Sequence, residues 1–371
     1  MKTKVIEFIT DLGDAGAETL VKDYALLLDK EKFEVVILTR YPTNNSANYQ
    51  QLIASGIKIL SINRSNSTLT KIINKLTFHV RIPIIMKRII DTEKPDVIHA
   101  HLAQLRYLRT VSKRLKGIKL IYTCHNVVEH YFGKKQKLEK KAAEYLILNN
   151  DLQLVALHDD MKKELDQLFG ISNTVVVHNG IDFNRFLNVS VTKEEKRKEL
   201  GIPETAFVVG HIGRFAEQKN HPFLIEVFKQ VADRNANAFL LMIGAGDTSY
   251  VTAKMREYQL EDRYLILSNR IDIPELLKSM DVFVFPSLFE GLGIVLIEAQ
   301  LLQLKCVVSD KIPNEAIKRN TTIVMSLDKD PKQWCDVIFD NNIRGDIIGN
   351  INDYDMNSEI HVLEKLYLNK I

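Results

Sequence analysis

Two glutamates flank a pair of glycines in the stretch 286–299, where a short apolar strand is followed by a helix. Glu290 stands in the loop, and Glu298 stands about two turns into the helix. Glu298 has valine, leucine and isoleucine beside it, where a carboxylate is costly unless hydrogen-bonded, and a pair of sugar hydroxyls would satisfy it. Gly291 and Gly293 bare the backbone amides where the helix begins, ready for a phosphate or a sugar hydroxyl. The stretch predicts a site for a sugar or a phosphorylated ligand, although a helix-start glutamate and a structural carboxylate would give the same pattern.

A second candidate is the loop Gly210–His221, which follows one strand and precedes a helix. It carries Arg214 and Lys219, five residues apart. Ligands of open α/β sheets bind in the crevice at the carboxyl ends of the strands, and both cations are expected there. Arginine donates forked hydrogen bonds and lysine supplies a point charge, a combination suited to a diphosphate. The alternative is two solvated surface cations.

Two glycine-containing loops are weaker candidates. Residues 13–18 join the first strand to the first helix, and their small side chains let backbone amides approach an anion, although a plain tight turn would have the same composition. Gly244 and Gly246 close a later strand, but Ser249 stands where a dinucleotide fingerprint needs its third glycine. This second loop is interpreted as a turn at the ligand edge of the sheet.

Three histidines end strands in the first half of the chain. His125 is expected to face the cleft between two domains, where it would contact a sugar hydroxyl or orient the acceptor; a structural role fits it equally well. His99 and His101 are two residues apart, so they point the same way on a strand, and they are expected only to line that cleft. The histidines form no HExxH pattern and the three cysteines have no ligand spacing, so no metal site is predicted.

Short apolar strands alternate with amphipathic helices along the chain, which predicts an α/β fold with parallel sheets covered by helices on both faces. With 371 residues, two Rossmann-like domains are expected: residues 1–185, and residues 186–356, which begin with a polar and charged segment at 187–200. Expected strands lie at 4–10, 33–39, 57–62, 96–100, 120–124, 154–157, 174–177, 207–212, 239–243, 264–267, 282–285 and 306–309. Expected helices lie at 17–28, 69–93, 222–234, 274–279, 292–302 and 357–368.

The charge of the chain is small overall and uneven. The formal net charge is +3, yet residues 69–141 hold 17 basic and 5 acidic side chains. This excess is either a solvated surface or an attraction to anionic lipid or to a phosphorylated acceptor. No nucleic-acid-binding motif accompanies it. Neither a leader sequence nor an apolar stretch long enough to cross a bilayer is expected, so a cytoplasmic protein with peripheral membrane contact is predicted.

Taken together, these motifs resemble glycosyltransferase family 4, the retaining GT-B enzymes that include many bacterial capsule and exopolysaccharide transferases. The resemblance covers essentially the whole chain. It rests on Gly16-Ala17-Glu18, His125, Val177–Asp182, Gly213-Arg214 with Lys219, Gly244–Gly246, and above all Glu290 with Glu298. The family often has proline where His178 stands and a glycine pair where Ala15-Gly16 stands.

The resemblance implies a fold and a set of roles. The two Rossmann-like domains would face each other across a cleft, with the terminal helix at 357–371 returning to the first. The donor diphosphate would be bound and stabilised as leaving group by Arg214 and Lys219, the ribose by Glu298, and the donor sugar by Glu290 and His125. Further donor contacts would come from Gly16, Gly244, Arg270, Ile271, Gly291, Leu292, Gly293 and Ile294.

The resemblance further implies retaining transfer from a nucleotide diphosphate-sugar, expected to be a UDP-sugar, to a glycan or lipid-linked glycan, with no cofactor and no metal. Two alternatives stay open at this point. A nucleotide-sugar 2-epimerase shares the two-domain architecture and would convert the donor without an acceptor. A catalytically degenerate partner subunit would bind the nucleotide sugar without turnover. A nicotinamide dehydrogenase fits least, because neither glycine loop matches the fingerprint.

Overall fold

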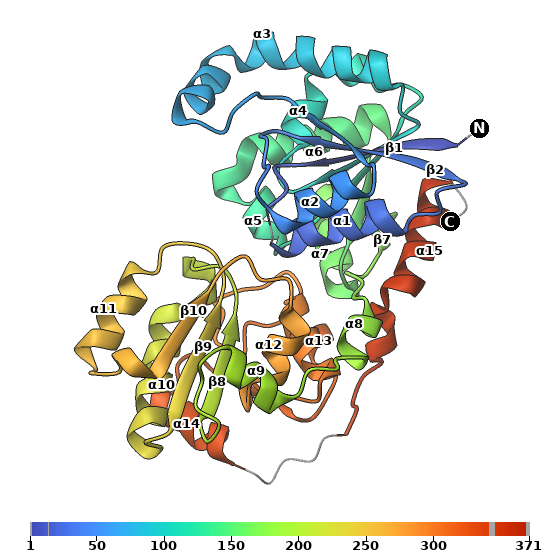
Figure 1. Ribbon diagram of the computed structural model, residues 1–371. Coiled ribbons are helices and arrows are strands. Elements are labelled where there is room, and N and C mark those ends of the chain that lie inside the picture. The colour runs from blue at the N-terminus through green and yellow to red at the C-terminus, as the bar shows by residue number, and fades with distance from the viewer. Residues whose placement is uncertain (1, 14, 341–345, 369–371) are drawn as a thin grey trace. The chain divides into compact units, whose positions relative to one another are not determined.

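The structure is a computed structural model that describes residues 2–13, 15–340 and 346–368. The chain divides into two units (Figure 1): unit 1 holds the residues up to Gly180 together with the segment from Asn357 onward, and unit 2 holds Ile181–Met356. This boundary lies a few residues before the expected one at 185. Ile181 pairs with Asp355 and its amide donates to the Tyr354 carbonyl at 2.7 Å, so the chain already belongs to unit 2 there.

Unit 1 is built on a parallel sheet with the strand order β3-β2-β1-β4-β5-β6-β7. Since β2 and β4 lie on opposite sides of β1, the direction of strand addition reverses between β1 and β4. The strands are β1 (Thr3–Ile9), β2 (Phe33–Thr39), β3 (Lys58–Ser61), β4 (Val97–His101), β5 (Lys119–Thr123), β6 (Gln153–Ala156) and β7 (Val175–Val176).

Helices follow the strands of unit 1 in the alternation that parallel connections require. They are α1 (Gly16–Leu27), α2 (Ala47–Ala54), α3 (Thr68–Glu93), α4 (Leu105–Arg109), α5 (Val128–Phe132), α6 (Lys137–Asn150) and α7 (Asp159–Phe169), with short 3-10 turns at Ser112–Arg114 and Lys134–Gln136. The terminal helix α15 (Met356–Tyr367) buries Ile360, Leu363, Leu366 and Tyr367. The described residues 357–368 belong to unit 1.

Unit 2 repeats the design with the strand order β10-β9-β8-β11-β12-β13. Its strands are β8 (Phe207–Ile212), β9 (Ala238–Ile243), β10 (Tyr264–Leu267), β11 (Val282–Phe285), β12 (Lys305–Ser309) and β13 (Thr322–Met325). Its helices are α8 (Phe183–Leu187), α9 (Lys193–Glu199), α10 (His221–Arg234), α11 (Ser249–Glu257), α12 (Ile273–Lys278), α13 (Ile294–Leu301) and α14 (Pro331–Phe339). The reversal of strand addition falls between β8 and β11, which pair directly.

Both faces of the unit 2 sheet are covered, so its central strands are apolar throughout. Every residue of β9 and of β11 is buried. The core on one face gathers Val209, Leu240 and Val284 from the strands with Phe228 and Trp334 from α10 and α14. The predicted α/β fold with parallel sheets is therefore confirmed.

The polar segment that follows the expected domain boundary is ordered. The polar segment at 187–200 contains α9, which begins at a capping box in which Thr192 and Glu195 exchange side-chain-to-backbone hydrogen bonds. Such a box satisfies two amides that would otherwise lack partners at the helix start. Arg197 of this helix is buried and donates at 2.7 Å to Asp281, just before β11. Among the described residues, no helix is long and apolar enough to span a membrane.

Candidate active site

The strongest cluster of predicted site residues lies at the carboxyl edge of the unit 2 sheet, where strand addition reverses. The loop with Arg214 and Lys219 follows β8, and the loop with Glu290 and Gly293 follows β11. Because β8 and β11 are neighbours, the two loops leave the sheet side by side. This reversal point is where doubly wound sheets bind their ligands, and two of the sequence candidates converge on it.

Lys219 and Glu290 form a largely buried ion pair at this point. Lys219 Nζ lies 2.6 Å from Glu290 Oε1, and the two side chains are 15% and 7% exposed. The ammonium also lies 4.7 Å from the ring centre of Phe285, the last residue of β11. An ion pair this buried stabilises little by itself, but the loss of one partner leaves an uncompensated charge. The pair therefore fixes a cation on a rigid part of the sheet edge.

Gln218 joins this pair, although the sequence analysis passed it over. Its Nε2 donates to Glu290 Oε2 at 3.1 Å and to the Phe289 carbonyl at 3.0 Å. The backbone carbonyl of Gln218 accepts a hydrogen bond from the backbone amide of Leu288 at 2.8 Å. The loops after β8 and β11 are thus tied together by the Gln218 side chain, by one backbone bond and by the Lys219–Glu290 ion pair. The available signal was its position directly before Lys219.

Glycines bring the backbone of a third loop against this site. A Cβ on Gly244, which follows β9, would lie 2.0 Å from the carbonyl oxygen of Gly213, which follows β8. Gly246 has a φ of +134°, and a Cβ added there would lie 2.7 Å from the carbonyl oxygen of Phe215. The amide of Phe215 donates to the Ala245 carbonyl at 2.8 Å. These glycines are required for close approach of two loops, which supports their interpretation as a turn at the ligand edge.

Helix α13 begins two residues later than expected. Gly293 has a φ of +81°, in the left-handed region, so the helix starts at Ile294 rather than at Leu292. Leu292 is buried, and Glu298 on this helix is half-buried with Ile297 and Ala299 buried beside it. The guanidinium of Arg214 is exposed and makes no ion pair with the described residues. It is therefore available to an incoming anion.

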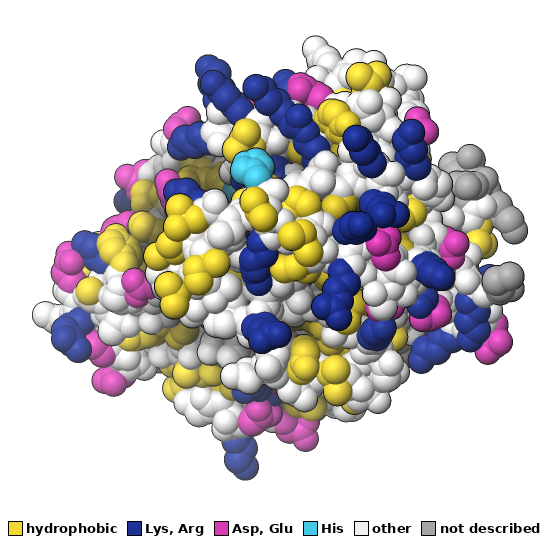
Figure 2. Space-filling model, turned by 90° about the horizontal axis from the view of Figure 1, so that it is seen from above, with side chains coloured by type: hydrophobic (Ala, Val, Ile, Leu, Met, Phe, Trp, Pro, Cys, Tyr) yellow, Lys and Arg dark blue, Asp and Glu magenta, His cyan; other side chains and the backbone are white. Residues whose placement is uncertain are grey.

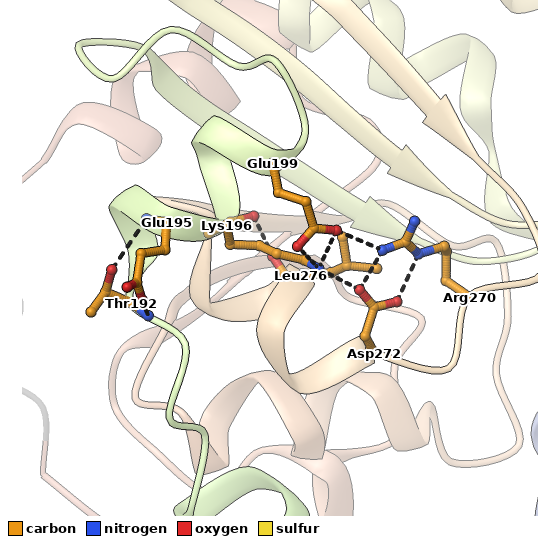
Figure 3. A network of polar contacts seen from close by, with 8 residues as sticks. Thr192, Glu195, Lys196, Glu199, Arg270, Asp272 and Leu276 are labelled. Carbon is orange, nitrogen blue, oxygen red and sulfur yellow. Dashed lines mark hydrogen bonds and ion pairs between the residues drawn. The ribbon is translucent and has the colours of Figure 1, made fainter.

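Arg270 belongs to a network of charges rather than standing alone (Figure 3). It donates to Asp272 from Nε at 2.7 Å, and Lys196 lies 2.6 Å from the same carboxylate. Lys196 also lies 2.8 Å from Glu199. The Arg270 hydrogen bond lowers the pKa of Asp272 well below its usual range. This network holds the turn after β10, where Ile271 is exposed and its carbonyl accepts from Arg185 at 2.8 Å.

In unit 1, the loop after β1 lies where strand addition reverses between β1 and β4. Gly16 is the first residue of α1, which begins one residue before its expected start. The carbonyl of Gly13 accepts from Asn48 at 2.7 Å, and its amide donates to Asp11 at 3.1 Å. Asp14 lies outside the described residues.

His99 and His101 do point the same way from β4, with ring centres 4.1 Å apart, but the prediction that they line a cleft is wrong. Both are fully buried, because they meet the Glu7 carboxyl group from β1 inside the unit. Glu7 accepts from Tyr367 at 2.6 Å and lies 2.7 Å from His101 Nε2. The signal for Glu7 was a carboxylate in the apolar run at 5–9; Tyr367 gave none, since its partners are distant in sequence.

His125 is half-buried and lies at the outer end of this network. Its Nε2 is 2.8 Å from His101 Nδ1, and its buried Nδ1 has no hydrogen-bond partner among the described residues. A neutral imidazole has one donor and one acceptor nitrogen, so the chain Glu7–His101–His125 is coupled. If Glu7 is protonated on Oε2, it donates to His101, and His125 Nδ1 becomes a donor. If Glu7 is ionised, every proton in the chain reverses and His125 Nδ1 becomes an acceptor.

Burial determines which of these states is stable. Burial raises the pKa of Glu7 to about 8 and lowers the pKa of His101 to about 3. Near neutral pH the network is therefore mostly uncharged, and His125 Nδ1 is mostly a donor. Among the described residues, Glu7, His99 and His101 are the group with ligand atoms near enough to hold a metal ion, within 4.8 Å of one another. Their atoms already bond to one another, to Tyr367 and to Thr123, so we describe them as a hydrogen-bond network.

The wild type is expected to lose stability as pH rises, because Glu7 ionises while buried. Glu7→Gln is expected to abolish this loss. The pKa of Glu7 is higher in the folded protein than its value of 4.5 in the unfolded chain, so its full contribution to stability is present below pH 4.5. This contribution is lost as pH rises toward 8. The slope in that window is at most about 1.4 kcal/mol per pH unit. Urea unfolding between pH 5 and 8 measures it. Both proteins should still lose stability as pH falls, because the pKa of His101 is lowered in the folded state. If the free energies of unfolding of the two proteins changed in parallel with pH above pH 5, the assignment to Glu7 would be contradicted.

Two protein-family models match the chain. Residues 15–185 match the model described as Glycosyltransferase Family 4. Residues 192–334 match the model described as Glycosyl transferases group 1. The first match falls almost entirely on unit 1 and the second on unit 2. Together they account for most of the chain.

Two curated relatives extend over long stretches. A protein named glycosyltransferase EpsF, from Bacillus subtilis, is 28% identical over 346 residues, which is 90% of this chain and 86% of the relative. The UDP-Gal:alpha-D-GlcNAc-diphosphoundecaprenol alpha-1,3-galactosyltransferase of Escherichia coli is 30% identical over 245 residues, which is 64% of this chain and 63% of the relative.

Solved structures share the architecture. The crystal structure of Anabaena HepE in complex with UDP and glucose superposes with a TM-score of 0.77 at 19% identity and covers 100% of both chains. WaaG, described as a glycosyltransferase involved in lipopolysaccharide biosynthesis, gives a TM-score of 0.70 at 13% identity over 90% of this chain and 89% of WaaG. At these identities the likeness shows the fold, which is the GT-B architecture.

Proposed function

Because the chain belongs to the glycosyltransferases of family 4 and group 1, we propose that it transfers a sugar from a UDP-sugar to a glycan or lipid-linked glycan, with retention at the anomeric carbon. Synthesis of a surface polysaccharide is the proposed setting. The E. coli relative is named for a UDP-galactose donor and a diphosphoundecaprenol-linked acceptor. The HepE structure holds UDP and glucose. Both names support a UDP-sugar donor.

The observation that carries this proposal is the Lys219–Glu290 pair at the reversal point of the unit 2 sheet. Breaking the bond between the anomeric carbon and the diphosphate develops negative charge on the leaving phosphate. A cation already held in place stabilises that charge without reorganisation at the moment of reaction. The Lys219 ammonium is fixed within 2.6 Å of Glu290 on the sheet edge. The exposed guanidinium of Arg214 on the same loop adds forked donors suited to the same diphosphate.

The chemistry at the acceptor follows from charge balance. The acceptor hydroxyl forms the new bond to the anomeric carbon while the bond to the diphosphate breaks. Its proton passes to an oxygen of the departing phosphate, on the face that the leaving group vacates, so configuration is retained. No metal ion takes part in this proposal, because the two cations neutralise the leaving group.

The remaining roles stay predictions from the family resemblance. Glu298 is assigned to the ribose hydroxyls and Glu290 to the donor sugar. The turn at Arg270 and Ile271 is assigned to the base, and the amides from Gly291 to Ile294 to the sugar and phosphates. In unit 1, Gly16 is assigned to the phosphates and His125 to the donor sugar.

A thermal-shift panel of nucleotide diphosphates and their sugars tests the donor assignment. UDP and one UDP-sugar are expected to stabilise the wild type, and a ligand at a hundred times its Kd adds about 2.7 kcal/mol. Glu298→Ala should lose most of this shift, because it removes the ribose contact. Glu257→Ala, at an exposed end of α11, is the matched control and should keep it. A well-folded wild type that responds to no nucleotide would refute donor-dependent transfer.

A further inference from the structure

Unit 1 contains a strongly basic pocket away from the network around Glu7. The cavity measures about 490 Å³ and opens at the carboxyl ends of β2 and β4, among α3, α4 and the start of α6. Its lining carries seven cationic side chains: Arg40, Lys71, Lys75, Arg106, Lys134, Lys135 and Lys137. The acidic residue in the lining is Glu139, which is buried and accepts from the Leu105 amide at 2.7 Å. Burial raises the pKa of Glu139 to about 7, so it offsets little of this charge.

Acidic side chains of the described residues do not neutralise the cations of this pocket. None of the seven makes an ion pair within the described part of the chain. Instead, Arg40 and Arg106 lie over aromatic rings, 5.4 Å from the ring centre of Tyr107 and 5.0 Å from that of Phe78. Like charges gathered in one cavity repel one another, so the arrangement is costly unless an anion enters it.

Two buried donors in the lining have no acceptor among the described residues. Asn74 is 4% exposed, and its Oδ1 accepts from Arg81, which can only donate, so its Nδ2 is the free end of the amide. The Nε of Arg40 is likewise buried without a partner, while its NH2 donates to Thr10 at 3.3 Å. Buried donors are nearly always satisfied in native proteins. The pocket is therefore built with donors and cations for an anion with several oxygens.

The face of α3 beside the pocket indicates the source of that anion. This helix exposes Leu69, Ile72, Leu76, Val80 and Ile84, with Leu76 79% exposed. Lys71, Asn74, Lys75 and Phe78 of the same helix line the pocket. Figure 2, which looks down on α3, shows Lys and Arg side chains among exposed hydrophobic ones. Apolar side chains interspersed with cations suit the surface of an anionic bilayer.

We propose that this pocket binds the diphosphate group of a lipid-linked acceptor while the exposed face of α3 rests on the bilayer. The inference rests on the proposed function, because it assigns the acceptor side of the same transfer. The cavity is large enough for two phosphate groups, and Lys71 and Lys75 stand where the apolar face of α3 meets the pocket. A free diphosphate offers the same chemistry, so the test must separate the two sources.

Flotation with three kinds of vesicle provides the test: phosphatidylcholine alone, phosphatidylcholine with phosphatidylglycerol, and phosphatidylcholine with a polyprenyl diphosphate at equal surface charge. The wild type should bind the third kind most tightly, and free inorganic pyrophosphate should compete. Lys71→Gln/Lys75→Gln should weaken that binding about tenfold or more, as the loss of charge-assisted bonds to phosphate predicts. Lys87→Gln/Lys113→Gln removes the same charge from exposed lysines outside the pocket lining and should change it less than about twofold.

Each outcome decides the proposal. Equal binding to both anionic vesicles, or equal losses in the two double variants, would show a general anionic surface and overturn the diphosphate site. Pyrophosphate binding without preference for the polyprenyl diphosphate would overturn the lipid source. The flotation assay contains no donor, so it does not depend on donor binding by unit 2. A UDP thermal shift retained in both variants shows that unit 2 is intact, and its absence in the wild type would count against the proposed function alone.

Discussion

Lys219→Met is expected to reduce the rate of sugar transfer by about 100- to 1,000-fold, the range seen when one preorganised group that stabilises a leaving charge is removed. The substitution also leaves the Glu290 carboxylate buried, with the hydrogen bond from Gln218 retained. An uncompensated buried charge costs about 3–5 kcal/mol, so the single variant is expected to lose stability as well. The double variant Lys219→Met/Glu290→Gln separates the two effects, because it restores neutrality while the cation stays absent.

The measurement is the initial rate of nucleotide diphosphate release in the presence of acceptor, alongside urea unfolding. Lys229→Met is the matched control: it makes the same change in an exposed i,i+4 pair with Asp233 on α10 and should cost only a few tenths of a kcal/mol. A Lys219→Met/Glu290→Gln protein that folds and transfers at the wild-type rate would remove Lys219 from the chemistry.

Gly244→Ala is expected to weaken donor binding about tenfold or more. The new Cβ would lie 2.0 Å from the backbone oxygen of Gly213, a contact that no side-chain rotation relieves. The loop after β8 must therefore move, and Arg214 and Lys219 move with it. Overpacking of this kind costs about 1–3 kcal/mol of stability. A loss of only about 1.4 kcal/mol in binding already raises Kd tenfold.

The UDP thermal shift across a concentration series measures this effect. Gly349→Ala is the control, because its Cβ would meet first the flexible side chain of Lys318, at 3.0 Å, which can turn away. That variant should bind UDP as the wild type does. A Gly244→Ala protein with unchanged Kd would mean that the backbone contact between the two glycine loops does not position the donor site.

Most strands and several helices, α3 and α10 among them, were predictable from the sequence. The runs at 33–39, 207–212, 264–267 and 282–285 coincide with β2, β8, β10 and β11. They are continuous apolar segments because helices cover both faces of each sheet, and that pattern is local. Helix α3 was expected to begin at residue 69 and begins at Thr68. Ser67 is its N-cap, and the Ser67 side chain accepts a hydrogen bond from the backbone amide of Thr70. The convergence of Lys219 and Glu290 followed from their shared position at strand ends.

The features that the sequence analysis missed include the helices α6 and α7, shorter helices, and a network of distant contacts. Helices such as α5 and α8 have only five residues each, too few for a helical periodicity to appear. The network around Glu7 depends on contacts between β1, β4 and α15, which are hundreds of residues apart at their extremes. A strand-end histidine at an edge and one turned into the interior look alike in sequence. The burial of His99 and His101 depends on contacts with Tyr367 and Glu7 that no local sequence pattern indicates.

The return of α15 to unit 1 has a consequence for the order in which the molecule is made. Unit 1 is completed by residues from Asn357 onward, whereas unit 2 is a continuous segment. Glu7, fully buried in the first strand, receives its Tyr367 hydrogen bond only when the last helix has been synthesised. On the ribosome, unit 2 can fold as soon as it emerges, while unit 1 must wait with part of its interior open. The first half of the chain to be translated is thus the last to be finished, and nascent unit 1 is the part most in need of protection.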